Sequence, residues 1–254
     1  MTSKFKKYVR PPFPRIGNKK HMLNIILKYM PDHTKYIEGF VGSGFMFFNK
    51  PIRPSILNDL DTNVVERLEL LKKAPLEGYK KDFTLNESKR FFNTTPRTIQ
   101  DKLLWHKVKS TGGFQSKDVE KSKQIYRSSS HTNTLVKNIP LYKQLLKDAT
   151  ITHLDYKKLR RYDSPTSFFF LDPPYENTFK GSYNEKETGA TTFDFESFKD
   201  WCNSLKGFVM ITLNDSKTIR ELFKDWIIVP HKTYGEMTNA MRKELIIMNY
   251  TLPQ

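Results

Sequence analysis

The sequence predicts an α/β protein with a doubly wound, seven-stranded sheet that is interrupted once by a mainly helical insertion. Three observations predict this fold class. Short apolar runs recur towards both ends of the 254-residue chain, and amphipathic stretches with helical spacing lie between them. One long polar and basic segment, about residues 75–148, breaks the alternation. Strands that alternate with helices are typical of doubly wound sheets.

Seven apolar runs are the predicted strands. Each is short, rich in β-branched or aromatic residues, and bounded by Gly, Asp, Asn or Pro. Their apolar character is continuous rather than alternating, which indicates burial on both faces, as in a parallel sheet. The predicted strands cover residues 35–38, 55–58, 150–154, 167–171, 207–213, 226–229 and 244–250.

The predicted helices show apolar residues at a spacing of three and four. Asp61 is a candidate N-cap of the second one, because its carboxylate can accept from free backbone N–H groups. A segment at 110–133 contains Gly112-Gly113 and is predicted to be a long loop or hairpin. The predicted helices cover residues 20–30, 61–73, 195–205 and 216–226, with weaker helical patterns at 98–108 and 141–148.

Charge is distributed unevenly along the chain. The formal net charge is +16, and residues 80–161 hold 19 Lys and Arg against 7 Asp and Glu, a net charge of +12. A concentrated basic segment is typical of a surface that binds a polyanion. We therefore predict one domain built from residues 1–74 and 149–254, with residues 75–148 inserted as a subdomain that binds a polyanion.

The composition excludes several other classes of protein. A single cysteine, Cys202, excludes an internal disulfide and favours a reducing compartment. No Cys/His cluster has the spacing of a zinc site, so no metal is expected. The apolar runs are too short to cross a bilayer, and the N-terminus lacks the apolar core of a signal peptide. We expect a cytoplasmic protein with no membrane partner and a monomeric state by default.

A glycine-rich turn follows the first predicted strand. In "YIEGFVGSGFMF", Gly39, Gly42 and Gly44 would let the backbone approach a ligand closely. The second strand ends in "ILNDLD", where an acid at the strand tip can bind ribose hydroxyls, and Asp59 directly follows that strand. Together the two motifs indicate a nucleotide-type cofactor.

The motif "LDPPY" follows the fourth predicted strand and suggests a reaction at an amine. An amino group on an aromatic ring is a poor nucleophile because its lone pair is delocalised. The Asp172 carboxylate and the Pro173 carbonyl can each accept one of its N–H groups, which favours the localised lone pair. The rings of Pro173 and Pro174 hold both acceptors in place, and Tyr175 can stack on the base.

These motifs, in this order, resemble the Dam-type DNA adenine methyltransferases of the alpha group. The matching segments are "RIGNKK", "YIEGFVGSG", "ILNDLD", "LDPPY" and "MRKELIIMNY", and the resemblance covers about residues 12–72 and 150–250. It implies a catalytic, Rossmann-like methyltransferase domain at residues 1–74 and 149–254, and it makes the insert at 75–148 a target-recognition, DNA-binding subdomain. It also implies S-adenosylmethionine as methyl donor and the 6-amino group of adenine in DNA as acceptor. The target sequence does not follow from it, because the insert lacks the family's usual hairpin.

The resemblance also implies roles for individual residues. Asp172, Pro173, Pro174 and Tyr175 match the catalytic tetrad. Arg15 stands where relatives often carry an aromatic residue, although a guanidinium can also stack on a ring. The implied cofactor-binding residues are Arg15, Lys19, Glu38, Phe40, Gly42, Gly44, Asp59, Asp155 and Asp172.

Methyl transfer is expected to be direct, to a base flipped out of the duplex, because an amine inside the base stack cannot enter a pocket. No covalent intermediate is needed, so Cys202 is interpreted as core. Residues 176–193 are predicted to order over the flipped base, and a restriction endonuclease is a possible partner. The predicted DNA contacts are Lys109, Gln115, Lys117, Lys121, Lys123, Arg127, Arg242 and Lys243.

Three alternatives share parts of this pattern. An RNA adenine methyltransferase would use the same site chemistry. A protein glutamine methyltransferase also acts on an amide nitrogen, but such enzymes typically carry Asn where Asp172 stands. A catalytically inert DNA-binding relative would keep the basic insert without needing the tetrad.

Overall fold

The computed structural model describes residues 8–13, 15, 17, 19–79, 95–111, 128–176, 192–234 and 241–251. The chain forms two compact units. Residues 19–41, 50–65 and 148–254 form the sheet unit, and residues 1–18, 42–49 and 66–147 form the helical unit. The predicted insert at 75–148 falls within the helical unit, and its role as a target-recognition subdomain stays a prediction.

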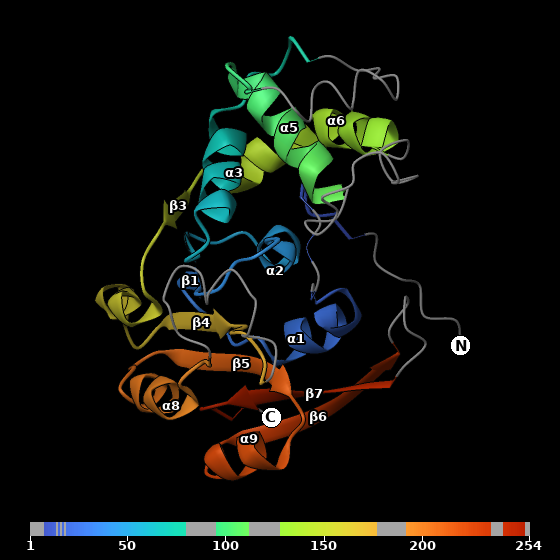
Figure 1. Cartoon of the computed structure of the whole chain (residues 1–254). Coiled ribbons are helices and arrows are strands. Elements are labelled where there is room, and N and C mark those ends of the chain that lie inside the picture. Colours follow the sequence, from blue (N-terminus) through green and yellow to red (C-terminus); the bar gives the residue numbers. More distant parts are fainter. Residues whose placement is uncertain are drawn as a thin grey trace. The chain divides into compact units, whose positions relative to one another are not determined.

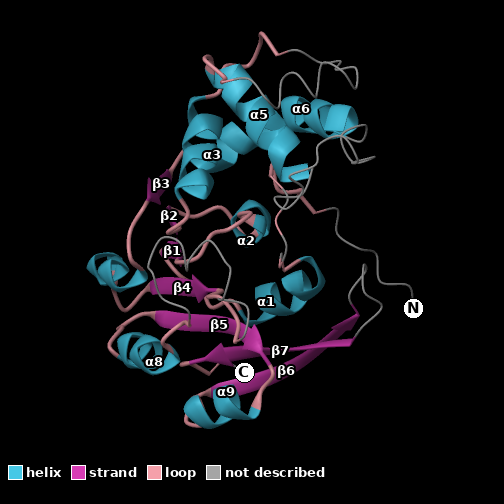
Figure 2. Cartoon of the chain, viewed as in Figure 1, coloured by secondary structure: helices cyan, strands magenta, loops and turns pink. Residues whose placement is uncertain are grey.

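The sheet unit is built on one seven-stranded sheet in the order β3-β2-β1-β4-β5-β7-β6 (Figures 1 and 2). The strands from β3 to β5 pair in parallel, whereas β7 pairs antiparallel with both β5 and β6. The seven-stranded α/β sheet is confirmed. Parallel pairing does not extend to β7, because continuous apolar character reports burial on both faces and not strand direction.

All seven predicted strands are present, with ends that differ from the predicted ones by a few residues at most except in the last two. The strands β6 and β7 are longer than predicted, because polar residues continue the pairing at the sheet margin. The observed strands are β1 (Lys35–Glu38), β2 (Ser55–Asn58), β3 (Ala149–Thr152), β4 (Ser167–Leu171), β5 (Phe208–Asn214), β6 (Ile227–Tyr234) and β7 (Met241–Met248).

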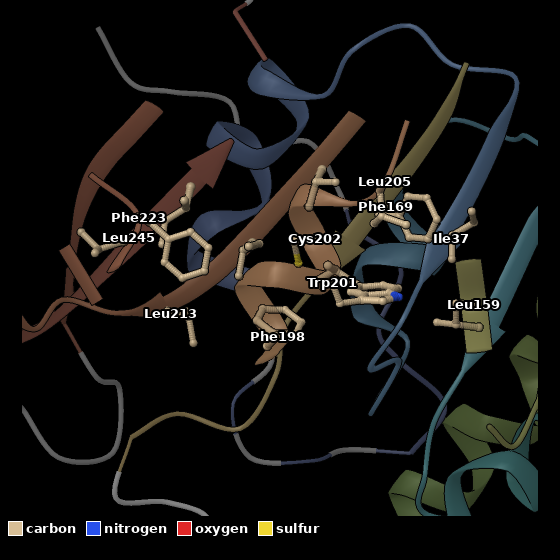
Figure 3. Packing of buried hydrophobic residues seen from close by; sticks show 14 of the residues in the cluster. Ile37, Leu159, Phe169, Phe198, Trp201, Cys202, Leu205, Leu213, Phe223 and Leu245 are labelled. Atoms are coloured by element: carbon tan, nitrogen blue, oxygen red, sulfur yellow. The ribbon is translucent and has the colours of Figure 1, made fainter. Parts of the chain in front are cut away.

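Helices α8 (Phe195–Asn203) and α9 (Lys217–Leu222) cover one face of this sheet (Figure 1). Both begin at a side-chain cap: Asp194 accepts from the N–H of Ser197, and Ser216 accepts from the N–H of Ile219. Fully buried apolar side chains from the sheet and both helices form one cluster, and each contributes about 1.5–3 kcal/mol by leaving water. Figure 3 shows Phe198, Trp201, Cys202 and Phe223 among its members, which confirms that Cys202 is core.

The opposite face of the sheet carries the alternate residues of the same strands. Because side chains alternate across a strand, the cluster members Ile211 and Leu213 place Thr212 and Asn214 on the other face. This face is covered by α1 (Leu23–Tyr29), which follows the 3-10 turn η1 (Lys20–Met22) (Figure 1). Met22 of η1 and Ile26 of α1 are buried. A second 3-10 helix, η3 (Tyr156–Tyr162), connects β3 to β4.

The helical unit contains α2 (Phe45–Asn49), most of α3 (Thr62–Lys73), α5 (Ile99–Thr111) and α6 (Ser128–Leu146). The prediction of a loop or hairpin over 110–133 is wrong where it overlaps these helices, since α5 extends to Thr111 and α6 begins at Ser128. Pro140 removes a backbone donor and lies inside α6. The helix nevertheless continues through it because one face, Leu135, Ile139, Tyr142 and Leu146, is fully buried.

The N-terminal segment of the described chain packs against these helices. The Tyr142 hydroxyl donates to the Arg10 carbonyl at 2.8 Å, and the Lys107 ammonium donates to the Pro12 carbonyl at 2.5 Å. Burial lowers the pKa of Lys107 to about 8. Across the described ranges, no helix has the length and apolar character needed to span a membrane.

Candidate active site

The candidate site lies along the carboxyl edge of the sheet unit. The parallel strands β3, β2, β1 and β4 end at the same edge, and an acidic residue stands at or just beyond the end of each. Because β7 runs the other way, its first half lies at this edge too, and Glu244 pairs with Asn214 at the end of β5. In the order of the strands, these acids are Asp155, Asp59, Glu38, Asp172 and Glu244.

Asp172 directly follows β4, and partners from two other parts of the chain hold its carboxylate. The Lys19 ammonium lies 2.7 Å from Oδ2, and the Thr212 hydroxyl donates to Oδ1 at 2.8 Å. The Lys19 side chain is only 5% exposed, and that of Asp172 is 20% exposed. A charge-assisted contact at this distance in a partly dry site is stronger than its surface counterpart.

Opposing influences act on the protonation of Asp172. Removal from water raises the pKa of the Asp172 carboxyl, and the nearby Glu244 raises it further. The Lys19 charge and the hydrogen bonds from Lys19 and Thr212 lower that pKa, but burial is the larger effect. The net result is a carboxyl that takes up a proton more readily than an ordinary aspartic acid.

The residues after Asp172 are fixed by β5 and β7. The Tyr175 hydroxyl donates to Glu244 Oε1 at 2.5 Å, and the Lys19 ammonium lies 5.1 Å from the centre of the Tyr175 ring. The Asn214 side chain accepts from the N–H of Glu176 at 3.3 Å and donates to its carboxylate at 3.2 Å. The turn that carries the tetrad is thus held by side chains as well as by its two prolines.

Glu38, the last residue of β1, is 3% exposed and faces the same side of the sheet as Thr212. The Tyr36 hydroxyl donates to Glu38 Oε2 at 2.8 Å, and burial together with the Glu38 charge raises the pKa of Tyr36. The Lys50 ammonium lies 4.5 Å from the centre of the Tyr36 ring, and burial lowers the pKa of Lys50 to about 8. Tyr36 therefore stays protonated and keeps Glu38 oriented.

The loop after β1 is tied down by Asn58, the buried last residue of β2. Its amide N–H groups donate to the carbonyls of Gly39 and Leu154, at 3.1 and 2.9 Å. Its amide oxygen accepts from the Leu154 N–H at 3.0 Å and from the Thr152 hydroxyl at 2.8 Å. One side chain thus joins the loop after β1 to the loop after β3.

The other predicted cofactor residues of the sheet unit lie around this junction. The Phe40 ring is 5.7 Å from that of Tyr156. The Asp59 carboxylate accepts from the Asp61 N–H at 2.9 Å, and Asp61 caps α3 as predicted, accepting from the Asn63 N–H at 2.9 Å. Asp155 is exposed and caps η3 by accepting from the Lys157 N–H at 2.8 Å. Their roles towards a cofactor stay predictions.

The remaining predicted residues belong to other parts of the chain. Arg15, Gly42 and Gly44 lie in the helical unit, where both glycines adopt a positive φ, +51° and +70°, a region that favours glycine. For Lys109 in α5 and Arg242 in β7, the structure describes the backbone. Lys243 is exposed on β7. Gln115, Lys117, Lys121, Lys123, Arg127 and most of the predicted 176–193 loop lie outside the described residues.

Sequence reasoning missed two residues that contact the tetrad, Thr212 and Glu244. Thr212 is a polar residue among the apolar residues of "FVMITLN", and Glu244 directly precedes the apolar half of "MRKELIIM". The phase of each residue in its strand puts it on the face opposite α8 and α9. A polar residue inside a buried strand was the available signal. Among the described residues, no group of three or more His, Cys, Asp or Glu side chains has an arrangement that could hold a metal ion.

The sheet order with its single reversed strand, and an Asp-Pro-Pro-Tyr turn held at the carboxyl edge, define a Rossmann-like methyltransferase. The comparison with family models gives the particular family. The model of the D12 class N6 adenine-specific DNA methyltransferases matches residues 16–237, and the chain belongs to this family. Membership of a methyltransferase family implies a methyl donor.

Individual relatives agree with this family. The chain is 26% identical to the modification methylase StsI of Streptococcus sanguinis, over 98% of the chain and 44% of the relative. It is 23% identical to the type II methyltransferase M.FokI of Planomicrobium okeanokoites, over 84% of the chain and 34% of the relative. It is also 23% identical to the type II methyltransferase M1.LlaDCHI of Lactococcus lactis subsp. cremoris, over 98% of the chain and 99% of the relative. The chain therefore spans less than half the length of the first two.

Proposed function

We propose that this chain methylates the 6-amino group of adenine at specific sites in DNA. The observation that carries the proposal is the position of Asp172, which Lys19 and Thr212 hold at the carboxyl edge of the sheet beside the Tyr175 ring. The family, described as N6 adenine-specific DNA methyltransferases, supports the same activity. The relatives, named as a modification methylase and as type II methyltransferases, agree with it.

In this proposal the four residues of the tetrad act on the acceptor amine. The Asp172 carboxylate accepts one N–H of the amine and the Pro173 carbonyl accepts the other, so the lone pair is directed towards the methyl group. Pro174 restricts the turn, and Tyr175 stacks on the base. The base has to leave the duplex to reach them, and holding it in place supplies much of the acceleration.

S-adenosylmethionine is the proposed methyl donor, and when bound it supplies a methyl group on a positively charged sulfur. The charges of the site fit such a cation, because Glu38, Asp172 and Glu244 outnumber the ammonium of Lys19. The residues proposed to hold it are Arg15, Lys19, Glu38, Phe40, Gly42, Gly44, Asp59, Asp155 and Asp172.

DNA is the proposed macromolecular partner. The basic residues of the segment at 75–148 would neutralise phosphates, and Gln115 would face base edges. Lys243, exposed at the start of β7, would add a phosphate contact near the site. The names of the relatives support a place in a restriction-modification system. A restriction endonuclease as partner and the cytoplasm as location are part of the proposal.

The test is transfer of label from methyl-labelled S-adenosylmethionine to duplex DNA, RNA and protein in parallel. The wild type is compared with Asp172→Ala, which removes the carboxylate that accepts from the amine, and with Glu221→Ala, which changes an exposed carboxylate on α9. The proposal predicts label on adenine in DNA for the wild type and Glu221→Ala, and none for Asp172→Ala. Label on RNA or protein alone would reject DNA as substrate.

A further inference from the structure

Glu244 is the one acidic residue of the site edge to which neither the sequence motifs nor the proposed function assigns an individual role. It stands on β7, opposite Asn214 of β5 and His231 of β6. Its neighbours Leu245 and Ile247 alternate with it, and both of their side chains belong to the core cluster under α8 and α9. Glu244 therefore points to the other face, the face of Asp172 and Thr212, and its side chain is 15% exposed.

The contacts of this carboxylate involve two parts of the proposed reactive centre. Oε1 accepts from the Tyr175 hydroxyl at 2.5 Å and lies 3.9 Å from the Lys19 ammonium. Lys19 in turn contacts Asp172 Oδ2 at 2.7 Å. One oxygen of Glu244 thus touches the ring proposed to stack on the base and the cation that holds the amine-accepting carboxylate.

We propose that Glu244 is a positioning residue for methyl transfer, which fixes the plane of the Tyr175 ring and the place of the Lys19 ammonium. This inference rests on the proposed function of the same site. A tyrosine that only stacked would need no buried acceptor for its hydroxyl, because the end of a phenol usually reaches water. Here the hydroxyl is fixed at a strand, so the ring has one orientation before any base arrives.

The antiparallel direction of β7 makes this contact possible. A parallel strand next to β5 would begin at the far edge of the sheet, and its first residues could not reach Tyr175. In the observed register Glu244 lies beside Asn214, which holds Glu176, while Thr212 two residues earlier holds Asp172. Strand β5 thus holds both ends of the Asp172–Glu176 turn, and β7 holds Tyr175 between them.

The experiment is a double-mutant cycle with Tyr175→Phe, Glu244→Ala and the combined variant. Tyr175→Phe keeps the ring and removes the hydroxyl, and Glu244→Gln keeps an acceptor for that hydroxyl. Single-turnover methyl transfer to DNA, the Kd values for S-adenosylmethionine and DNA, and the melting temperature are measured for each protein. Glu221→Ala is the matched control, since that carboxylate is exposed and pairs only with Lys224 among the described residues.

Each single variant is expected to slow methyl transfer about tenfold, because a slight misplacement of the reacting groups lowers the rate. Cofactor binding should not weaken to a matching extent. The combined variant should be within about twofold of the slower single one, because both remove the same hydrogen bond. Glu244→Gln should recover most of the rate.

Fully additive losses in the cycle would overturn the inference alone, and so would a Glu244→Ala protein that transfers as fast as the wild type. A loss matched by equal losses in melting temperature and cofactor affinity would also overturn it, because it would show a structural role only. A wild type that binds S-adenosylmethionine but transfers no methyl group to DNA would overturn the proposed function, and this inference with it.

Discussion

At the scale of single residues, Asp172 depends on a balance between burial and neighbouring charges. Two carboxylates, Asp172 and Glu244, share one ammonium, that of Lys19. Burial dominates, so the pKa of Asp172 is raised above its usual range even with Lys19 at 2.7 Å. Asp172, which is proposed to accept a hydrogen bond from the amine, therefore becomes protonated and loses its charge at a higher pH than a surface aspartate does.

This balance predicts the acid side of the pH–rate profile. Transfer requires the ionised carboxylate, so the rate should fall as the pH drops through the raised pKa of Asp172. Lys19→Met removes a charge that lowers this pKa, and the fall should then occur at higher pH than in the wild type. Single-turnover rates measured from about pH 4 to about pH 9 test this expectation, because the upper limit lies well above the pKa of an ordinary carboxyl. Lys224→Met, an exposed lysine on the surface, is the control.

A profile that stays in place in Lys19→Met, or that moves to lower pH, would contradict the assigned cause of the shift. The same assay separates the two groups that hold the carboxylate, because Thr212 also lowers the pKa of Asp172 through its hydrogen bond.

Thr212→Val tests that hydrogen bond with almost no change in volume. The variant loses the 2.8 Å bond to Asp172 Oδ1 inside a fully buried strand, which should cost about 0.5–1.5 kcal/mol of unfolding free energy. Its acid limb should also move to higher pH. Thr212→Ser keeps the hydroxyl and should retain the wild-type profile. Urea unfolding and the pH–rate profile measure the two effects, and a Val variant as active at low pH as the Ser variant would contradict the role.

At the scale of elements, Asn58 joins three parallel strands where they end. Its four hydrogen bonds connect the loop after β1 to residues at and after the end of β3. All four are buried or partly buried, so losing them leaves carbonyl and N–H groups without water or partner. The glycine-rich loop owes its position to this side chain as well as to its own backbone.

Asn58→Leu should therefore be strongly destabilising. Removing the amide leaves several buried polar groups unsatisfied, each worth about 1–3 kcal/mol, so a total loss of about 2–4 kcal/mol is expected. Asn203→Ala, which removes one exposed contact with the Trp226 indole, should cost no more than about 0.5 kcal/mol. Urea unfolding of the three proteins measures the difference. Equal stabilities of the two variants would mean that Asn58 is not the tie between these loops.

Local sequence pattern was sufficient for the elements of the sheet unit and for the tetrad. The strands were found because buried runs such as "SFFFL" are continuous and end at turn residues, and Asp61 was found because a cap lies next to its helix. Helix α6 was predicted only from residue 141, because Pro140 is locally unfavourable and the buried face that offsets it is tertiary.

The partners of Asp172 and Tyr175 could not be predicted in the same way. Lys19 was placed near the cofactor by resemblance, but its ion pair with Asp172 joins residues far apart in the chain. Thr212 and Glu244 become neighbours of the tetrad through the order of the sheet and the reversal of β7. Strand direction is set by the long-range pairing of the finished sheet, and no local pattern reports it.

At the scale of the whole molecule, charge separates the middle of the chain from its C-terminal third. Residues 80–161 carry a net charge of +12, whereas residues 162–254 hold 10 Lys and Arg against 13 Asp and Glu, a net charge of −3. The acidic share includes Asp172 and Glu244 of the site edge. A polyanion and a cationic cofactor are therefore each matched by a different part of the sequence.

DNA binding should weaken steeply with salt. If the basic segment neutralises six or more phosphates, affinity should fall on the order of a thousandfold between about 50 and 200 mM salt. The combined change Lys117→Glu, Lys121→Glu and Lys123→Glu should reduce both the affinity and the salt slope, and leave S-adenosylmethionine binding unchanged. The control, Lys206→Glu with Lys217→Glu, reverses two exposed charges of the sheet unit. Fluorescence anisotropy at several salt concentrations measures the slope, and equal slopes in both variants would contradict the assignment.

The reversal of β7 also affects when the site can exist during synthesis. The groups around Asp172 come from residue 19, residue 212 and residue 244, so nearly the full length of the chain has to be made before they can meet. Such distant contacts form late in folding, because long loops must close first. A chain truncated before β7 would have the tetrad but not the carboxylate that holds Tyr175. Under the proposed function, methyl transfer at the full rate therefore requires a chain that extends at least through β7.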